Sequence, residues 1–266
     1  MLKYMLNHSM QAVSLSIACI LYASLHVIYA ADLEKEIRMK NQVIDYIMDG
    51  DAVLLKDGNH EFLSIYMVAD IQPAKGTVII MHGRGYHPNW PELVYPVRTG
   101  LPEHGWNTLS IQMPVLDNES SFYDYLDILH EAHPRINAAI AFLKSKKTEK
   151  IVLLAHSCSV HMAVDWLQKH KQVDVSGFIG VGMGSTDRGQ PMPEPFPLQD
   201  IKVPVLDIRG EHDYPAVIRN APRRMQNMII AGNPKSQQRV VKKSDHYFTD
   251  RGNALMLEVA DWLNSL

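Results

Sequence analysis

Five short segments of this chain are almost entirely apolar, and they limit its possible folds more than any other feature. They are rich in β-branched residues and lie at 77–81, 108–111, 151–155, 177–181 and 204–208. Strands buried on both faces have this pattern, because helices cover both sides of a parallel sheet. Helix-like stretches lie among and after them, at 122–145, 159–170, 215–230 and 253–265. The sequence therefore predicts an α/β fold with one doubly wound, mostly parallel sheet.

Three further strands are predicted outside this set. Residues 52–56 and 61–68 are apolar or alternating, and the turn-forming residues 57–60 separate them. This arrangement indicates an antiparallel hairpin near the N-terminus. The more polar segment 238–242 suits a strand at the edge of the sheet.

Helical spacing of apolar residues also precedes the hairpin, over about 33–50. We therefore expect a helical extension over 31–50 and one main domain over 51–266. Within that domain, Pro134 is expected to kink or end the helix at 122–145, because proline removes a backbone donor from a helix interior.

The N-terminus has the composition of a secretory signal peptide over residues 1–30. Lys3 precedes an apolar run over 12–30, and a polar stretch follows Ala30. This predicts a periplasmic mature protein. An uncleaved membrane anchor is the alternative, since the run approaches the ~20 residues that span a bilayer. Cleavage would leave Cys158 as the single cysteine, so no intramolecular disulfide is expected.

Charge and glycine patterns exclude several kinds of partner. The formal net charge is −3 and the basic residues are spread along the chain, which gives no footprint for nucleic acid. The glycine-rich segment 180–185 follows a late strand without a helix after it, so we predict a tight strand exit and no nucleotide cofactor. No metal is predicted, because the histidines lack metal-ligand spacing. The candidates weighed were His82, His87, His156, His161 and His212.

Four polar loops follow the predicted strands, and parallel strands bring such loops to one edge of a sheet. The loops are His82-Gly83-Arg84-Gly85, Ala155-His156-Ser157-Cys158-Ser159, Arg209-Gly210-Glu211-His212-Asp213 and Lys243-Ser244-Asp245-His246-Tyr247-Phe248. They contain a serine, a carboxylate and a histidine. A serine hydroxyl is a weak nucleophile that needs a base oriented by a third group.

These loops resemble those of the α/β-hydrolase fold superfamily of serine hydrolases and esterases, over roughly residues 50–266. The family has a G-x-S-x-G turn, here with Ala155 and Ser159 replacing the glycines, and the order serine, acid, histidine. The resemblance implies that Ser157, Asp213 and His246 are the catalytic triad. Segment 87–114 is similar to a bacterial subfamily of unassigned function.

The resemblance also implies an oxyanion hole and substrate contacts. The hole would use the backbone N–H groups of Arg84 and Cys158. Gly83, Gly85 and His156 are expected to contact substrate. The Cys158 thiol is expected to be buried and inert.

Other interpretations of the triad residues remain open from the sequence. Ser157 could be the N-cap of the following helix, and Asp213 could cap the helix that begins near Pro215. Asp207 and Glu211 are rivals for the acid, although Asp207 lies inside its strand.

The proline-rich segment 190–200 and the loop 114–123 predict a short cap over the site. Candidate pocket residues are Phe122, Tyr123, Met192 and Phe196. The predicted function is hydrolysis of a small-molecule carboxylic ester or thioester through an acyl-enzyme, without a cofactor. The alternatives are a non-catalytic binding or envelope-interaction scaffold, an acyltransferase or a peptidase.

Overall fold

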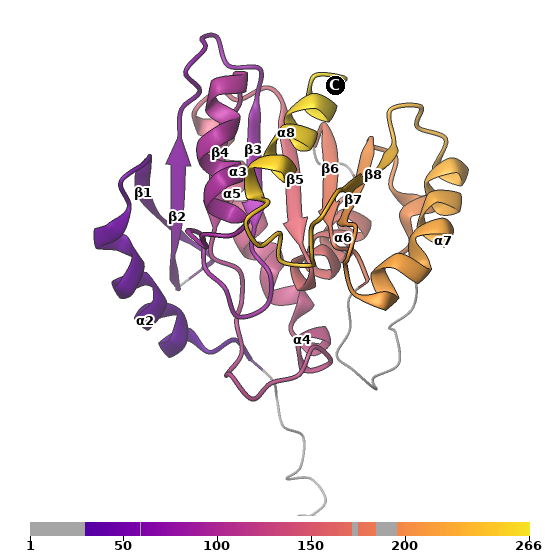
Figure 1. Cartoon of the computed structure of the whole chain (residues 1–266). Helices are drawn as coiled ribbons and strands as arrows, with labels where there is room; N and C mark the ends of the chain where they lie inside the picture. The colour runs from indigo at the N-terminus through magenta and orange to yellow at the C-terminus, as the bar shows by residue number, and fades with distance from the viewer. Residues whose placement is uncertain (1–29, 59, 172–174, 185–195) are drawn as a thin grey trace, which may run out of the picture. The chain divides into compact units, whose positions relative to one another are not determined.

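Eight strands lie side by side in one sheet in the computed structural model of this chain, which describes residues 30–58, 60–171, 175–184 and 196–266. Their order is β1-β2-β4-β3-β5-β6-β7-β8 (Figure 1). β2 runs antiparallel to β1 and to β4, and every pair from β4 to β8 is parallel. The predicted doubly wound sheet with an N-terminal antiparallel hairpin is confirmed.

The strands begin and end within about two residues of the predicted segments. They are β1 (Asp51–Lys56), β2 (Glu61–Met67), β3 (Thr77–Met81), β4 (Asn107–Ile111), β5 (Ile151–His156), β6 (Gly177–Val181), β7 (Val205–Gly210) and β8 (Gln237–Val241). The polar strand β8 lies at an edge of the sheet, as its composition predicts.

The helices predicted at 159–170, 215–230 and 253–265 match the structure to within two residues. The α-helices are α2 (Leu33–Val43), α3 (Val94–Gly100), α4 (Asp124–Asp127), α5 (Ala132–Ser145), α6 (Cys158–Lys169), α7 (Pro215–Ala231) and α8 (Gly252–Leu263). Short 3-10 turns are η1 (Ile44–Tyr46), η2 (Leu101–His104), η3 (Leu129–Glu131) and η4 (Leu198–Asp200). Helix α3 has no counterpart in the prediction. No helix in the described part of the chain has both the length and the apolar character for a membrane crossing.

The helix predicted over 122–145 is wrong in its middle. Ile128 leaves helical geometry, with φ −105° and ψ 11°, and separates α4 from η3 and α5. Pro134 neither kinks nor ends a helix, because it is the third residue of α5. N–H groups in the first turn have no intrahelical acceptor, so proline costs no hydrogen bond there.

The N-terminal helix is shorter than predicted and is docked by charge. Helix α2 ends at Val43, and Ile47 is already extended after η1. The buried side chain of α2 is Glu36, which accepts a hydrogen bond of 2.8 Å from Nη1 of Arg135. Arg135 also donates from Nε to Asp57 over 2.8 Å. An ionic network therefore ties α2 to α5 and to the turn after β1.

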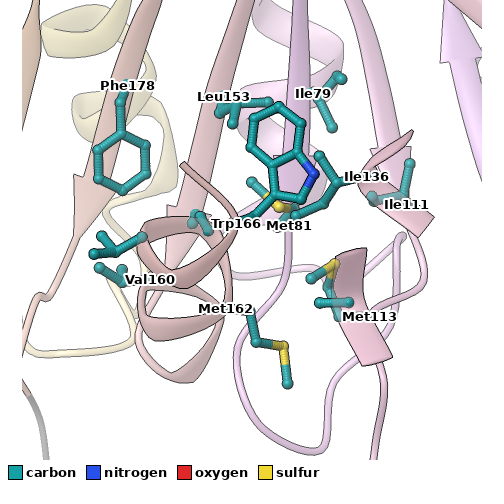
Figure 2. Packing of buried hydrophobic residues seen from close by; sticks show 14 of the residues in the cluster. Ile79, Met81, Ile111, Met113, Ile136, Leu153, Val160, Met162, Trp166 and Phe178 are labelled. Carbon is teal, nitrogen blue, oxygen red and sulfur yellow. The ribbon is translucent and has the colours of Figure 1, made fainter. Parts of the chain in front are cut away.

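Buried side chains form one apolar layer on each face of the sheet. Ile79 and Met81 of β3 face the layer that contains α5 and α6, including the fully buried Trp166 (Figure 2). Val78 and Ile80 face the layer of α3 and α8. Successive side chains of a strand point to opposite faces of the sheet. Because both faces are covered, successive residues of the strand are apolar.

Three of the predicted features lie mainly outside the described residues. They are the signal peptide over 1–30, the candidate pocket residue Met192 and most of the candidate lid over 190–200. Residues Ala31–Leu266 form one compact unit.

Asp207 of β7 provides a test of the packing between the sheet and α7. Its Oδ2 atom accepts hydrogen bonds from Nε of Arg224 at 2.8 Å and from Nε2 of Gln238 at 2.6 Å. The Asp207 carboxylate and the Arg224 guanidinium are both buried. Asp207→Ala leaves a buried guanidinium without a counter-charge, so we expect the free energy of unfolding to fall by about 3–5 kcal/mol. Urea denaturation measures this loss.

The control is Arg219→Ala, which truncates an exposed arginine of the same helix and should change stability by less than about 0.5 kcal/mol. Equal effects of the two substitutions would contradict the importance of the buried pair.

Candidate active site

Ser157 occupies the sharp turn between β5 and α6. Its φ of 53° and ψ of −114° lie in a region that costs a non-glycine residue about 1–3 kcal/mol. The conformation is held on both sides, because the Ser157 N–H donates to Val181 over 2.9 Å and its carbonyl accepts from Val160 over 3.0 Å. Ser157 stands at the N-cap position of α6, but its side chain makes no capping hydrogen bond there. It is partly exposed at the carboxyl edge of the sheet.

The structure brings Ser157, His246 and Asp213 into one hydrogen-bonded chain. Nε2 of His246 lies 2.9 Å from Oγ of Ser157, and Nδ1 lies 2.6 Å from Oδ1 of Asp213. A carboxylate only accepts, so Nδ1 carries the hydrogen and Nε2 of the neutral ring accepts from the serine. This is the polarity that a general base requires.

Asp213 is held by backbone donors and is fully buried. Its Oδ1 atom accepts from the N–H of Tyr214 over 2.8 Å, and Oδ2 accepts from the N–H of Gly210 over 3.3 Å. The rival carboxylates are engaged elsewhere. Asp207 pairs with Arg224, and Glu211 pairs with Lys242 at the surface.

The residues that replace the motif glycines fit the turn in different ways. Ala155 is buried within β5. Ser159 contributes a hydrogen bond, because its hydroxyl donates to the carbonyl of His82. The substitution of glycine by serine therefore fastens the loop after β3 to the first turn of α6.

The loop after β3 lies against Ser157. A Cβ atom added at Gly83 would lie 2.6 Å from Nδ1 of His156 and 3.5 Å from Cβ of Ser157, so only glycine allows this approach. Gly85 has φ 75° with open space around it, and its conformation explains the glycine. The Arg84 guanidinium donates from Nη1 to the carbonyl of Ser120 over 3.2 Å.

Cys158 is the first residue of α6 and directly follows the serine. First-turn N–H groups of a helix point toward its positive end, where they favour developing negative charge. The Cys158 thiol is buried. The two residues predicted for the oxyanion hole therefore lie in the two segments next to Ser157, Arg84 in the loop after β3 and Cys158 in the first turn of α6.

His156 does not line the site, and its predicted contact with substrate is corrected. Its side chain is fully buried. Nε2 lies 3.0 Å from the backbone carbonyl of His246, which only accepts, so Nε2 carries the hydrogen. Burial and the neighbouring His246 hold the pKa of His156 well below its usual value. The residue supports the loop that carries His246. Gly83 is likewise buried and lies against the His156 ring.

Two tyrosines beside the triad were not predicted to have a role. Tyr214 follows Asp213 in sequence, and Tyr247 follows His246. Their hydroxyl oxygens lie 2.6 Å apart, and the Tyr214 ring stacks on the His246 ring with centroids 4.3 Å apart. Burial raises the pKa of Tyr214, so the hydroxyl stays protonated. The pair links the acid loop to the base loop, and the sequence signal was the aromatic residue after each.

Gly182 also contacts the triad, from the exit of β6. Its φ is 65°, and a Cβ atom there would lie 2.8 Å from Cε1 of His246. The glycine-rich segment 180–185 is thus a tight strand exit through Gly184, the last described residue. The pattern gave no sign that one glycine lies against the base.

Other candidate histidines and pocket residues pack against their neighbours or lie at the surface. His161 is buried between the rings of Phe122 and Phe196, while His212 is exposed. Tyr123 is partly buried against the same apolar layer. In the described ranges, no group of three or more His, Cys, Asp or Glu residues is placed to hold a metal ion.

A family model described as "Protein of unknown function (DUF3530)" matches residues 30–125 and 125–265. The chain belongs to this family. A search of curated proteins gives no match.

Solved structures identify the fold. The chain is similar to dienelactone hydrolase from Anabaena variabilis, with a TM-score of 0.62 and 19% identity over 81% of this chain and 96% of that one. For Est1E from Butyrivibrio proteoclasticus the TM-score is 0.61 and the identity is 13%, over 80% of this chain and 98% of that one. For a soluble variant of monoglyceride lipase from Saccharomyces cerevisiae the TM-score is 0.58 and the identity is 11%, over 82% of this chain and 96% of that one. The α/β-hydrolase fold predicted from the four loops is confirmed.

Gly182 gives a test of how tightly the base is packed. Gly182→Ala places a methyl group against His246, so we expect the hydrogen bond from His246 to Asp213 to be disrupted. Proton NMR measures this as loss or displacement of the downfield Nδ1–H resonance.

The matched control is Gly232→Ala. Gly232 has φ 79°, but no atom lies within 4 Å of the position that an added Cβ atom would take. Both substitutions should lower the unfolding free energy by about 1–2 kcal/mol through backbone strain. An unchanged Nδ1–H resonance in Gly182→Ala would contradict the packing.

Three buried histidines predict that the fold is lost in acid. Burial lowers the pKa of His82 and of His161 to about 3 and that of His156 well below its usual value. Below about pH 6.5 these three histidines bind protons in the unfolded chain but stay neutral in the folded chain. The free energy of unfolding should therefore decrease as the pH falls below 6.5, by about 4 kcal/mol per pH unit when all three histidines contribute.

Urea denaturation between pH 6.5 and 5 measures this slope. His161→Leu should reduce the slope by about a third. The control His212→Ala changes an exposed histidine and should leave the slope nearly unchanged. An unchanged slope in His161→Leu would show that the buried imidazole is protonated in the folded state.

Proposed function

We propose that this protein is a serine hydrolase that cleaves carboxylic ester or thioester bonds through an acyl-enzyme intermediate. The observation that carries the proposal is the hydrogen-bonded chain from Ser157 through His246 to Asp213. Only the serine end of this chain is partly exposed, while the acid is buried. The reactive hydroxyl is therefore the group that a substrate can reach.

Acylation uses all three groups of the hydrogen-bonded chain. Oγ of Ser157 attacks the carbonyl carbon while Nε2 of His246 takes its proton, and buried Asp213 stabilises the imidazolium that results. The N–H groups of Arg84 and Cys158 are proposed to hold the oxyanion of the tetrahedral intermediate. As that intermediate collapses, Nε2 returns the proton to the departing alcohol or thiol.

Deacylation repeats the steps with water as the nucleophile. His246 takes a proton from water, the resulting hydroxide attacks the acyl group, and Ser157 leaves with the proton. Every proton and electron pair moves between substrate, water and groups of this chain. The proposed reaction therefore requires no added cofactor.

The strained conformation of Ser157 favours catalysis over a purely structural scaffold. Positive φ at a non-glycine residue persists only where surrounding contacts enforce it, and here backbone hydrogen bonds on both sides do so. The result aims the hydroxyl at a correctly polarised imidazole. A scaffold that only binds has no need for this arrangement.

Labelling with a small fluorophosphonate tests the proposal. Folded wild-type protein should be labelled on one serine, and Ser157→Ala should lose the label. Hydrolysis of p-nitrophenyl acetate should fall by about a thousand-fold or more in the same variant. Heat-denatured wild type should not react, because activation requires the folded triad.

The matched control is Ser145→Ala, which removes an exposed serine at the end of α5 and should keep full labelling. Folded wild-type protein that resists both the probe and the ester would overturn the proposal and favour a non-catalytic binding scaffold.

A further inference from the structure

Helix α7 presents an apolar stripe on its solvent side. Val217, Ala221, Arg224 and Met228 face the protein. Other apolar side chains of α7 are exposed to solvent, with exposed fractions of 37% for Ile218, 36% for Met225, 60% for Ile229 and 61% for Ile230.

The exposed apolar positions align along the helix axis. Tyr214, Ile218, Pro222, Met225 and Ile229 are all exposed, and steps of three and four residues place them on one helical face. We call these five residues the α7 stripe. Single exposed apolar residues are ordinary, but these five follow one another from Tyr214, the N-cap residue, to Ile229 over about 22 Å of the helix.

The exposed charges of α7 itself have one sign. Arg219 and Arg223 are exposed along one side of it, and α7 contains no Asp or Glu. Arg224 differs, because it is buried against Asp207. Across the described residues, neither exposed guanidinium has a carboxylate partner. An apolar stripe bordered by arginines is complementary to a surface that has an apolar interior and an anionic outer layer.

We propose that the α7 stripe docks on an anionic lipid bilayer, with Arg219 and Arg223 against headgroup phosphates. Helices that lie in the bilayer interface combine an apolar face with basic residues at its border.

The α7 stripe ends at the candidate active site. Tyr214 is its first residue, and the same ring stacks on His246. Docking would therefore set the site beside the lipid surface. Together with the proposed hydrolase function, on which this step rests, the placement favours membrane-associated acyl esters as the substrate class.

Hydroxyl-radical footprinting of the full-length protein, as isolated, tests the docking. The probes are vesicles of phosphatidylcholine with and without phosphatidylglycerol. We expect the phosphatidylglycerol vesicles to lower oxidation of Met225 at least about three-fold, while the exposed Met48 before β1 stays reactive. The readout is local to α7, so attachment through residues 12–30 does not mimic it.

Variants connect the protection to the proposed contacts. Arg219→Gln with Arg223→Gln, and separately Ile218→Gln with Ile229→Gln, should abolish the protection of Met225. Leu257→Gln, which changes an exposed residue of α8, should retain it. Ser157→Ala should also retain it, so loss of catalysis and loss of docking are separate results.

Two outcomes would overturn the proposal. Met225 that is equally reactive with and without phosphatidylglycerol vesicles would exclude docking of α7 on anionic lipid. Protection that rises with protein concentration in the absence of vesicles would identify a second copy of the chain as the occupant.

Discussion

The tight turn at Ser157 is the constraint around which the rest of the site is arranged. A strand in the middle of a parallel sheet must reverse into α6 within one residue, and φ of 53° at Ser157 accomplishes this. The neighbouring strand β6 stabilises the turn through the carbonyl of Val181. Because both flanking elements are deep in the fold, the strain at one residue is offset by contacts of the whole sheet.

A layer of buried polar groups supports this turn from behind. His156 donates to the backbone of the base loop, and the Ser159 hydroxyl donates to the carbonyl of His82. His82 itself accepts at Nε2 from the N–H of Met113 over 2.9 Å, while Nδ1 contacts the carbonyl of Gly83 at 2.8 Å. Burial keeps these imidazoles neutral. The His82 ring therefore holds one donor and one acceptor in place, and the His156 ring holds one acceptor.

The polar layer extends to the N-terminal helix. The side-chain amide of Gln112 lies 3.0 Å from Nε2 of His82, and the Gln112 carbonyl accepts from Arg135 over 3.3 Å. That acceptor is the backbone carbonyl of Gln112, and Arg135 in turn pairs with Glu36 of α2. Desolvation raises the pKa of Glu36, and the arginine opposes that shift. The helix before β1 is therefore connected through hydrogen bonds to the loop beside the candidate nucleophile.

The sequence by itself determined the sheet, the order of its loops and the identities of Ser157, Asp213 and His246 as candidates. Strand burial on both faces leaves a continuous apolar pattern, and parallel strands place successive loops at one edge. The tertiary structure decided what depends on distances between remote segments. It buried His156 instead of exposing it, paired Asp207 with Arg224, and placed Gly182 and Tyr214 against His246. Side-chain packing across the sheet makes these choices, and local sequence patterns carry no record of it.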